Sequence, residues 1–229
     1  LDMDNDYMVK IRLIRTKTYD TLCIKVNHAC CDGAGVKEYV QLLSHIYSVI
    51  SQEHGIFTPN PAKRGRKEQD MLFDALGIKD PESEWIPGSE ITRATWPFPW
   101  KKSQSTDTHM RICQILPEQM EKIVAHSKTK GVTVNDLILT AYYRAMLELG
   151  PSVFCEPMEI SVTVDLRRYL PDNKTEAIRN FSGSEIAKVT LSPGEAFDET
   201  LSKVRTAMQD IKNARPGLQS AIGLERIEK

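Results

Sequence analysis

The first fifty residues alternate between apolar and polar side chains and then change to a helical spacing. From Tyr7 to Ile14 every second side chain is apolar, which is typical of a strand with one buried face. A second alternating run covers Leu22–Val26, and the residues between the runs, 15–20, are few enough for a hairpin. Apolar positions three and four apart then predict an amphipathic helix that ends before Gly55: Val36, Tyr39, Val40, Leu43, Ile46, Tyr47 and Ile50.

Regular patterning is mostly lost between Gly55 and Asp107, where prolines accumulate. The exception is one short helical run near Glu68 to Leu76. Irregular stretches of this length are usually functional or connect domains. We therefore interpret the chain as two domains, residues 1–107 and 108–229.

A second patterned block follows the long connection. Thr133 and Asp136 have the spacing of a capping box at a helix start, and Gly150-Pro151 ends that helix. Before it we predict a strand over His109–Leu116 and a helix over Pro117–Lys130. After it, alternation predicts two strands, around 160–164 and over 185–191, and Ser192-Pro193-Gly194-Glu195 predicts the start of a last helix with proline at its first position. The order β-β-α, connection, β-α-α-β-β-α indicates an α/β protein.

The candidate site is the segment Asn27-His28-Ala29-Cys30-Cys31-Asp32-Gly33, which joins the second strand to the first helix. A histidine at a strand end projects into whatever cleft lies above the sheet, and imidazole is suited to take a proton near neutral pH. An aspartate four residues later can turn back and fix the loop, and Gly33 permits a tight turn. The segment therefore has the residues of a general-base site.

Other readings of the same segment stay open. His28 could be an ordinary loop histidine and Asp32 a helix cap. His28, the two cysteines and Asp32 could hold a metal, but zinc sites usually add a second ligand pair later in the chain, and no such pair follows. Cys31 could be a nucleophile, although a thiol at this place is more often packing. We therefore predict no metal.

Three further segments follow this one along the chain: Gly131-Val132-Thr133-Val134-Asn135-Asp136, Val164-Asp165-Leu166-Arg167-Arg168-Tyr169-Leu170-Pro171 and Asn180-Phe181-Ser182-Gly183. Together with His28, Asp32 and Gly33, the sequence resembles the superfamily of chloramphenicol acetyltransferases and nonribosomal peptide condensation domains, which includes alcohol and polyketide-associated acyltransferases. The family motifs are His-His-x-x-x-Asp-Gly, "GvTvndvl", "vdlR" and "GNf.g". Asn27 stands in place of the first histidine. The resemblance covers most of the chain except Gly55 to Asp107.

The resemblance implies two similar α/β lobes, each an α+β two-layer sandwich, with the active site between them. Residues 1–107 would then be the latter part of the N-terminal lobe and 108–229 the first part of the C-terminal lobe, incomplete at both ends. It implies an acyltransferase in which His28 deprotonates a hydroxyl or amine acceptor. The acceptor attacks an acyl thioester of coenzyme A or of a phosphopantetheinyl carrier, so these are co-substrates, and no tightly bound cofactor is expected.

The resemblance also implies a supporting role for Asp32. In that family the aspartate does not relay protons but forms a salt bridge with an arginine after the "vdlR" strand. Arg167 is the matching position and Arg168 the second choice. Losing either partner of a buried pair leaves an uncompensated charge. Asp32, Gly33 and Arg167 are therefore the expected structural support of the site.

Two alternative functions remain from the sequence. One is amide-bond condensation between carrier-bound substrates, with an acyl or peptidyl carrier protein as partner. The other is a non-catalytic homologue that serves as a binding module, which Asn27 keeps open.

Composition narrows the choice of partner and location. The net charge of −1 gives no argument for nucleic acid or an anionic membrane. The sequence contains no run of 18 or more apolar residues that would suggest a membrane span. Its five scattered cysteines are typical of reduced thiols. We expect a cytoplasmic protein.

Overall fold

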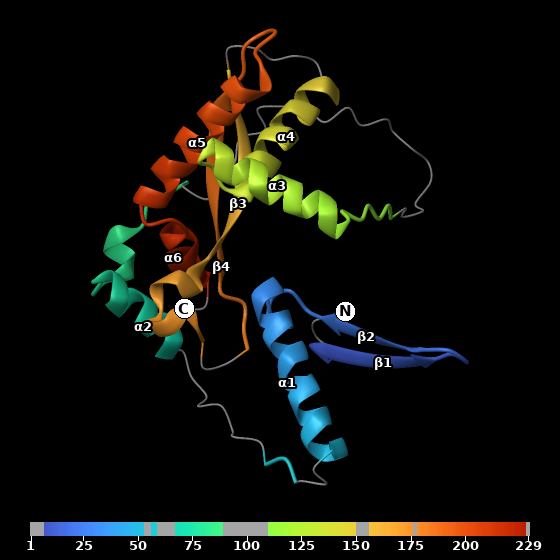
Figure 1. The fold of residues 1–229 in the computed structure, drawn as a ribbon. Helices are drawn as coiled ribbons and strands as arrows, with labels where there is room; N and C mark the ends of the chain where they lie inside the picture. Colours follow the sequence, from blue (N-terminus) through green and yellow to red (C-terminus); the bar gives the residue numbers. More distant parts are fainter. Residues whose placement is uncertain are drawn as a thin grey trace, which may run out of the picture. The chain divides into compact units, whose positions relative to one another are not determined.

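The computed structural model describes residues 7–52, 56–58, 67–88, 110–149, 156–175 and 178–227. The chain divides into two compact units, and each combines stretches that are distant in the sequence, as the colours in Figure 1 show. Unit 1 consists of Leu1–Ile86, Thr163–Gly183 and Gly217–Lys229, and unit 2 of Pro87–Val162 and Ser184–Pro216. The boundary expected from the sequence, between residues 107 and 108, lies outside the described residues. The units alternate along the chain, whereas the sequence suggested two consecutive domains.

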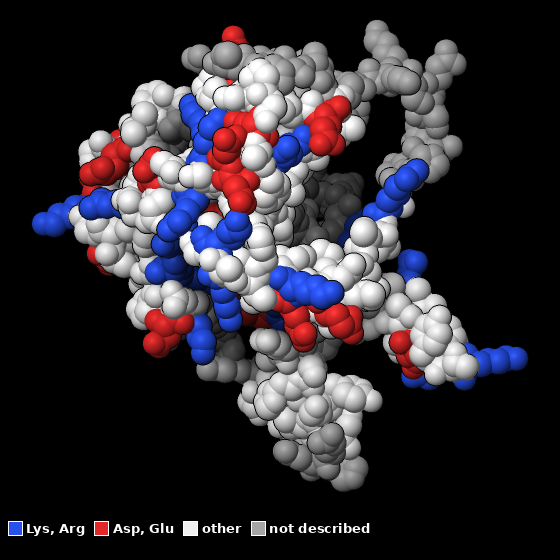
Figure 2. All heavy atoms as spheres, turned by 45° about the horizontal axis from the view of Figure 1, so that its top comes forward, with Lys and Arg blue, Asp and Glu red and all other residues white. Residues whose placement is uncertain are grey.

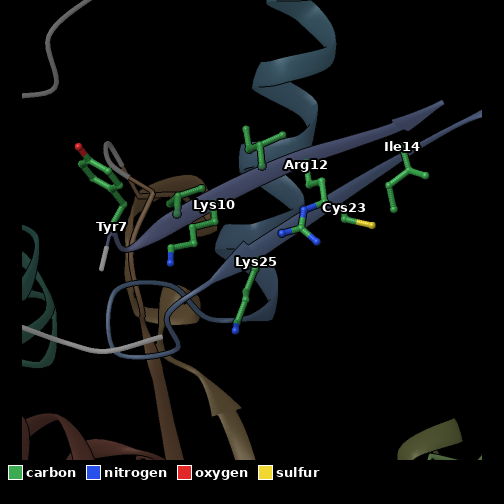
Figure 3. Close-up of a pocket in the computed structure, with 8 residues that line it drawn as sticks. Tyr7, Lys10, Arg12, Ile14, Cys23 and Lys25 are labelled. Carbon is green, nitrogen blue, oxygen red and sulfur yellow. The ribbon is translucent and has the colours of Figure 1, made fainter. Parts of the chain in front are cut away.

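Unit 1 begins with the predicted hairpin, which is confirmed. β1 (Val9–Arg15) pairs antiparallel with β2 (Asp20–Val26) along the full length of both strands. Side chains alternate between the faces of a strand, so one face of the hairpin is apolar. The other face carries Lys10, Arg12 and Lys25, which line a hollow in Figure 3.

Unit 1 has a small apolar core, to which some of its helices contribute. α1 (Gly33–Gln52) and α2 (Lys67–Leu76) confirm the helical spacing of the sequence. α6 (Leu218–Ile227) was not predicted, because Pro216 and Gly217 look like the end of the last helix. Short 3₁₀ helices cover Pro81–Glu84 (η1), Leu166–Tyr169 (η2) and Pro171–Asn173 (η3). The core contains Leu72, Phe73, Ile78, Leu166, Leu170, Phe181, Leu218, Ala221 and Ile222.

Most of the second patterned block belongs to unit 2. Its helices are α3 (Pro117–Lys130), α4 (Val134–Leu149) and α5 (Phe197–Asn213). The strands β3 (Pro157–Asp165) and β4 (Ser182–Thr190) pair with each other, and both cross from one unit to the other. The core of unit 2 contains Leu139, Tyr143, Met158, Ala187, Val189, Leu191, Val204 and Met208.

The predicted start of α4 and end of α3 are confirmed in atomic detail. The backbone N–H of Asp136 donates to the Thr133 hydroxyl at 3.1 Å, and the Thr133 N–H donates to the Asp136 carboxylate at 2.8 Å. These reciprocal bonds are a capping box. Gly131 ends α3 in the left-handed region, with φ of 64°.

Two sequence predictions in this block are wrong. Met110–Leu116 has no strand structure, because a strand needs a hydrogen-bonded neighbour and this segment has none among the described residues; His109 itself lies outside them. The helix predicted after Ser192-Pro193-Gly194-Glu195 is α5, and it starts at Phe197 rather than at the proline-containing turn. That turn has Gly194 in the left-handed region with φ of 71°, and Glu199 caps the helix by accepting the Ala196 N–H at 2.8 Å.

In the described part of the chain no helix is long and apolar enough to cross a bilayer. Basic and acidic side chains are intermingled on the face of the molecule that Figure 2 shows.

Candidate active site

His28 lies in the loop between β2 and α1. Asn27 shapes the loop: its side chain accepts the Ala29 N–H at 2.9 Å and its carbonyl accepts the Cys30 N–H at 3.2 Å. The His28 side chain is exposed and borders a hollow of about 350 Å³ within unit 1. Polar side chains that also line the hollow are Lys37, Thr163, Asp165 and Ser182. The imidazole is therefore open to a small molecule.

Asp32, four residues after His28, is buried, with 5% of its surface exposed. One carboxylate oxygen accepts the Gly35 N–H at 2.7 Å and a guanidinium N–H of Arg167 at 3.2 Å. The other accepts the Phe181 N–H at 2.8 Å and a second N–H of Arg167 at 2.8 Å. Because four donors converge on it, the carboxylate is fully hydrogen-bonded although it is shielded from water.

Arg167, in η2, is also buried, with 3% of its surface exposed. Besides its two bonds to Asp32, it donates to the Asp165 carboxylate at 3.2 Å and to the Arg179 carbonyl at 3.0 Å. Its Nε lies 3.5 Å from a carboxylate oxygen of Glu38. The arginine thus joins the loop of His28 to the end of β3.

The structure brings together Asp32 and Arg167, the pair expected from the resemblance. Arg168, the second choice, lies instead over the ring of Tyr169, 5.6 Å from its centroid. Two-pronged pairing of a carboxylate with a guanidinium fixes both groups in distance and orientation.

The charge state of the pair follows from these contacts. Burial alone would raise the pKa of Asp32, but hydrogen bonds from Arg167, Gly35 and Phe181 outweigh it and hold the pKa below its ordinary value. Burial likewise opposes the charge on Arg167, and the contacts with Asp32 and Asp165 reverse that effect and raise its pKa. The pair is therefore ionised over the whole physiological range.

A four-residue strip, Arg179–Ser182, contacts both the loop of His28 and Arg167. The Arg179 carbonyl binds Arg167, and the Phe181 N–H binds Asp32. Between them, the Asn180 side chain donates to the His28 carbonyl at 2.8 Å. Each of these three consecutive residues thus contacts a different part of the site.

The glycine that the site needs is not the one predicted. The φ of Gly33 is not in the left-handed region, and a Cβ added there would meet no atom within 4 Å. The tight turn expected at Gly33 is therefore absent, because the residue simply begins α1. A Cβ at Gly35 would lie 2.8 Å from both the Arg179 carbonyl oxygen and the Cys31 sulfur. The loop, the helix and the strip meet at Gly35.

The two cysteines of the loop have structural partners. The Cys30 thiol contacts the Asn27 carbonyl at 3.0 Å. Cys31 is buried, and burial, followed by the nearby Asp32 charge, raises the pKa of its thiol. A raised pKa keeps Cys31 a neutral thiol, which is a poor nucleophile. Among the described residues, no three His, Cys, Asp or Glu side chains gather as a metal site would require.

No model of a known protein family and no curated protein matches the sequence. Solved structures do match. Polyketide synthase associated protein 5 from Mycobacterium tuberculosis has 17% identity and a TM-score of 0.65, over 93% of this chain and 54% of that chain. The first condensation domain of the CDA synthetase has 17% identity and a TM-score of 0.61, over 91% and 47%. The X-domain from teicoplanin biosynthesis, in its complex with OxyB, has 14% identity and a TM-score of 0.59, over 96% and 52%.

These similarities confirm the expected resemblance at the level of the fold. The protein is α/β, with mixed helices and small sheets like those of condensation domains. The chain spans about half the length of the structures that it matches.

Sequence reasoning named His28, Asp32 and Arg167 but missed two contributors to the geometry. Gly35 was missed because the backbone atom that a Cβ would meet there, the Arg179 carbonyl oxygen, is distant in sequence. Asn180 was noted only as part of a motif segment, but its bond to His28 joins residues 152 positions apart. The signal that the sequence offered was its place in the segment Asn180-Phe181-Ser182-Gly183, which carries part of the resemblance.

Proposed function

We propose that this chain carries the catalytic histidine of an acyltransferase and that His28 is the general base. The observation that carries the proposal is the exposed His28 imidazole beside a hollow, in a loop fixed by the buried Asp32–Arg167 pair. A base that is open to substrate but held by rigid surroundings has the arrangement that proton transfer requires. The fold shared with a condensation domain agrees with this chemistry.

In the proposed reaction, His28 takes the proton from a hydroxyl or amine while that group attacks the carbonyl carbon of an acyl thioester. The tetrahedral intermediate then collapses, the carbon–sulfur bond breaks, and the imidazolium returns its proton to the departing thiolate. The products are an ester or amide and a free thiol. The donor would be acyl-coenzyme A or an acyl-phosphopantetheine. Because the histidine ends in its starting state, the cycle needs no tightly bound cofactor.

Asp32 supports the site without taking part in proton transfer. Its hydrogen-bond partners are Gly35, Arg167 and Phe181, and among the described residues none of its bonds goes to the imidazole. Both oxygens already face strong donors, which disfavours protonation. Its role would be to hold the loop in place through Arg167.

Amide-bond condensation between carrier-bound substrates is the alternative within catalysis. Among the matching structures is the first condensation domain of the CDA synthetase. The same base would then deprotonate an amine, and a peptidyl or acyl carrier protein would be the partner.

A binding module without catalysis is the alternative of a different class. The X-domain that this chain resembles was solved in a complex with another protein, OxyB. Asn27 precedes His28 here and is occupied with the backbone of the loop, so a folded loop could persist without turnover.

The test uses the protein that contains this chain, a panel of acyl-coenzyme A donors and detection of released thiol, with and without mixed alcohols and amines. We expect thiol release that depends on the acceptor and is lost in His28→Ala. His126→Ala, an exposed histidine on α3, is the matched control and should retain activity.

Release that survives His28→Ala would refute the assignment of the base. Silence across the panel would direct the search to carrier-bound donors. Binding of a loaded carrier with turnover supports condensation, and protein binding without turnover supports the module.

A further inference from the structure

The Asn180 side chain lies between the candidate base and a neighbouring serine. Its amide nitrogen donates to the His28 carbonyl at 2.8 Å and lies 3.5 Å from Nδ1 of the imidazole. Its amide oxygen accepts from the backbone N–H and the hydroxyl of Ser182, at 3.2 and 2.7 Å. Both ends of one short side chain are therefore occupied.

These contacts determine which way the amide points. The Ser182 N–H can only donate, so it requires the Asn180 oxygen on its side. The His28 carbonyl can only accept, so it requires the nitrogen on the other. A flipped amide would face a donor with a donor and an acceptor with an acceptor. The N–H groups of Asn180 are thus directed at His28.

The backbone of Asn180 is held by the buried ion pair. On one side the Arg179 carbonyl accepts from Arg167, and on the other the Phe181 N–H donates to Asp32. Movement of Asn180 would require breaking bonds to buried charged groups, which are stronger than ordinary hydrogen bonds. The rigidity of the pair therefore extends through Asn180 to His28.

We propose that Asn180 is the positioning residue of the base: its amide fixes the backbone of His28 and thereby the place of the imidazole at the hollow. The proposal rests on the proposed function of His28. The ion pair orients the loop as a whole, and Asn180 acts on the one residue that carries the chemistry. Its donor group, rather than its shape, is what the site uses.

Two substitutions separate the donor from the shape. Asn180→Ala removes both. Asn180→Asp keeps the shape but places an oxygen opposite the His28 carbonyl. We expect kcat to fall about 10- to 100-fold in Asn180→Ala, because small misplacements of a catalytic group have effects of this order. KM should change little, and Asn180→Asp should be the more impaired.

A packing role predicts the reverse order, because the isosteric Asp would be tolerated better than Ala. Asn135→Ala and Asn135→Asp, at an exposed position in the first turn of α4, are the matched controls and should leave kcat unchanged. Ser182→Ala removes one of two bonds to the amide oxygen, so its loss should be smaller than that of Asn180→Ala.

A second readout does not depend on turnover. The Hε1 resonance of His28, assigned by its disappearance in His28→Ala, should shift in both Asn180 variants and stay in place in the Asn135 variants. An unmoved resonance, or unchanged kcat in both Asn180 variants, overturns the proposal. If the wild-type protein shows no acyl transfer, the proposed function fails while the resonance still decides whether Asn180 positions His28.

Discussion

The residues of the candidate site depend on one another through a single buried carboxylate. Asp32 accepts hydrogen bonds from the start of α1, from η2 and from the strip that precedes β4. These contacts pair the buried N–H groups of Gly35 and Phe181 and the Arg167 guanidinium with the carboxylate. Burying an unpaired polar group costs more than a typical hydrogen bond contributes, so the carboxylate matters for the fold as well as for the site.

Asp32→Asn should destabilise the protein strongly. The change removes the negative charge and leaves the Arg167 guanidinium buried without its closest counter-charge, which costs about 3–5 kcal/mol in comparable pairs. Asp20→Asn is the control, because Asp20 pairs with Arg15 at 3.6 Å on the surface and such pairs contribute about 0–1 kcal/mol. Urea unfolding measures both variants. Equal midpoints for wild type and Asp32→Asn would rule out the supporting role.

Two glycines near the site should respond differently to alanine: the substitution should destabilise the protein at Gly35 and have little effect at Gly33. In Gly35→Ala the new methyl group meets the Arg179 carbonyl and the Cys31 sulfur at 2.8 Å, and overpacking of this kind costs about 1–3 kcal/mol. In Gly33→Ala the methyl group meets open space, so the change should stay within about 0.5 kcal/mol. Thermal melting of the two variants compares them directly. A melting temperature that is lower for Gly33→Ala than for Gly35→Ala would contradict the close approach at Gly35.

The elements show where the sequence pattern is sufficient and where it is not. Local signals were sufficient for α1 and for the start of α4: apolar spacing predicted the first, and the Thr133–Asp136 capping box predicted the second, because both depend on residues only three or four positions apart. The strand expected at Met110–Leu116 failed, because pairing depends on a partner and alternation cannot supply one. α6 was missed because its helical state is stabilised by Leu218, Ala221 and Ile222 in a core built from distant segments.

Tyr143 offers a test of how α4 is joined to β4. Its side chain is fully buried, its hydroxyl donates to the Ala187 carbonyl at 2.8 Å, and burial, followed by the charge of Glu159, raises its pKa. Tyr143→Phe should lower the free energy of unfolding by about 1 kcal/mol, the usual net value of one hydrogen bond. Tyr142→Phe, at the neighbouring and half-exposed position, should change it by less than about 0.5 kcal/mol. Chemical denaturation that finds the two variants alike would argue against this bond.

For the molecule as a whole, the family resemblance predicted more than the periodicity of the sequence did. The order of motifs anticipated the fold and paired Asp32 with Arg167. It could not anticipate the division into units, because β3 and β4 each belong to both of them. Nor could it identify Gly35 or the contact of Asn180, since both depend on close approach between segments that only the folded chain brings together.

The long separation between Asp32 and Arg167 has a consequence for biosynthesis. The pair closes a loop of 135 positions, and contacts of such range form late, because the entropy of loop closure must be overcome first. At a ribosomal rate of about 5–20 residues per second, Asp32 waits roughly 7–27 s before Arg167 has been made. During that interval the Asp32 carboxylate in the loop of His28 has no Arg167 guanidinium to pair with. A nascent chain stalled between the two residues would therefore be sensitive to proteases and chaperones at this loop.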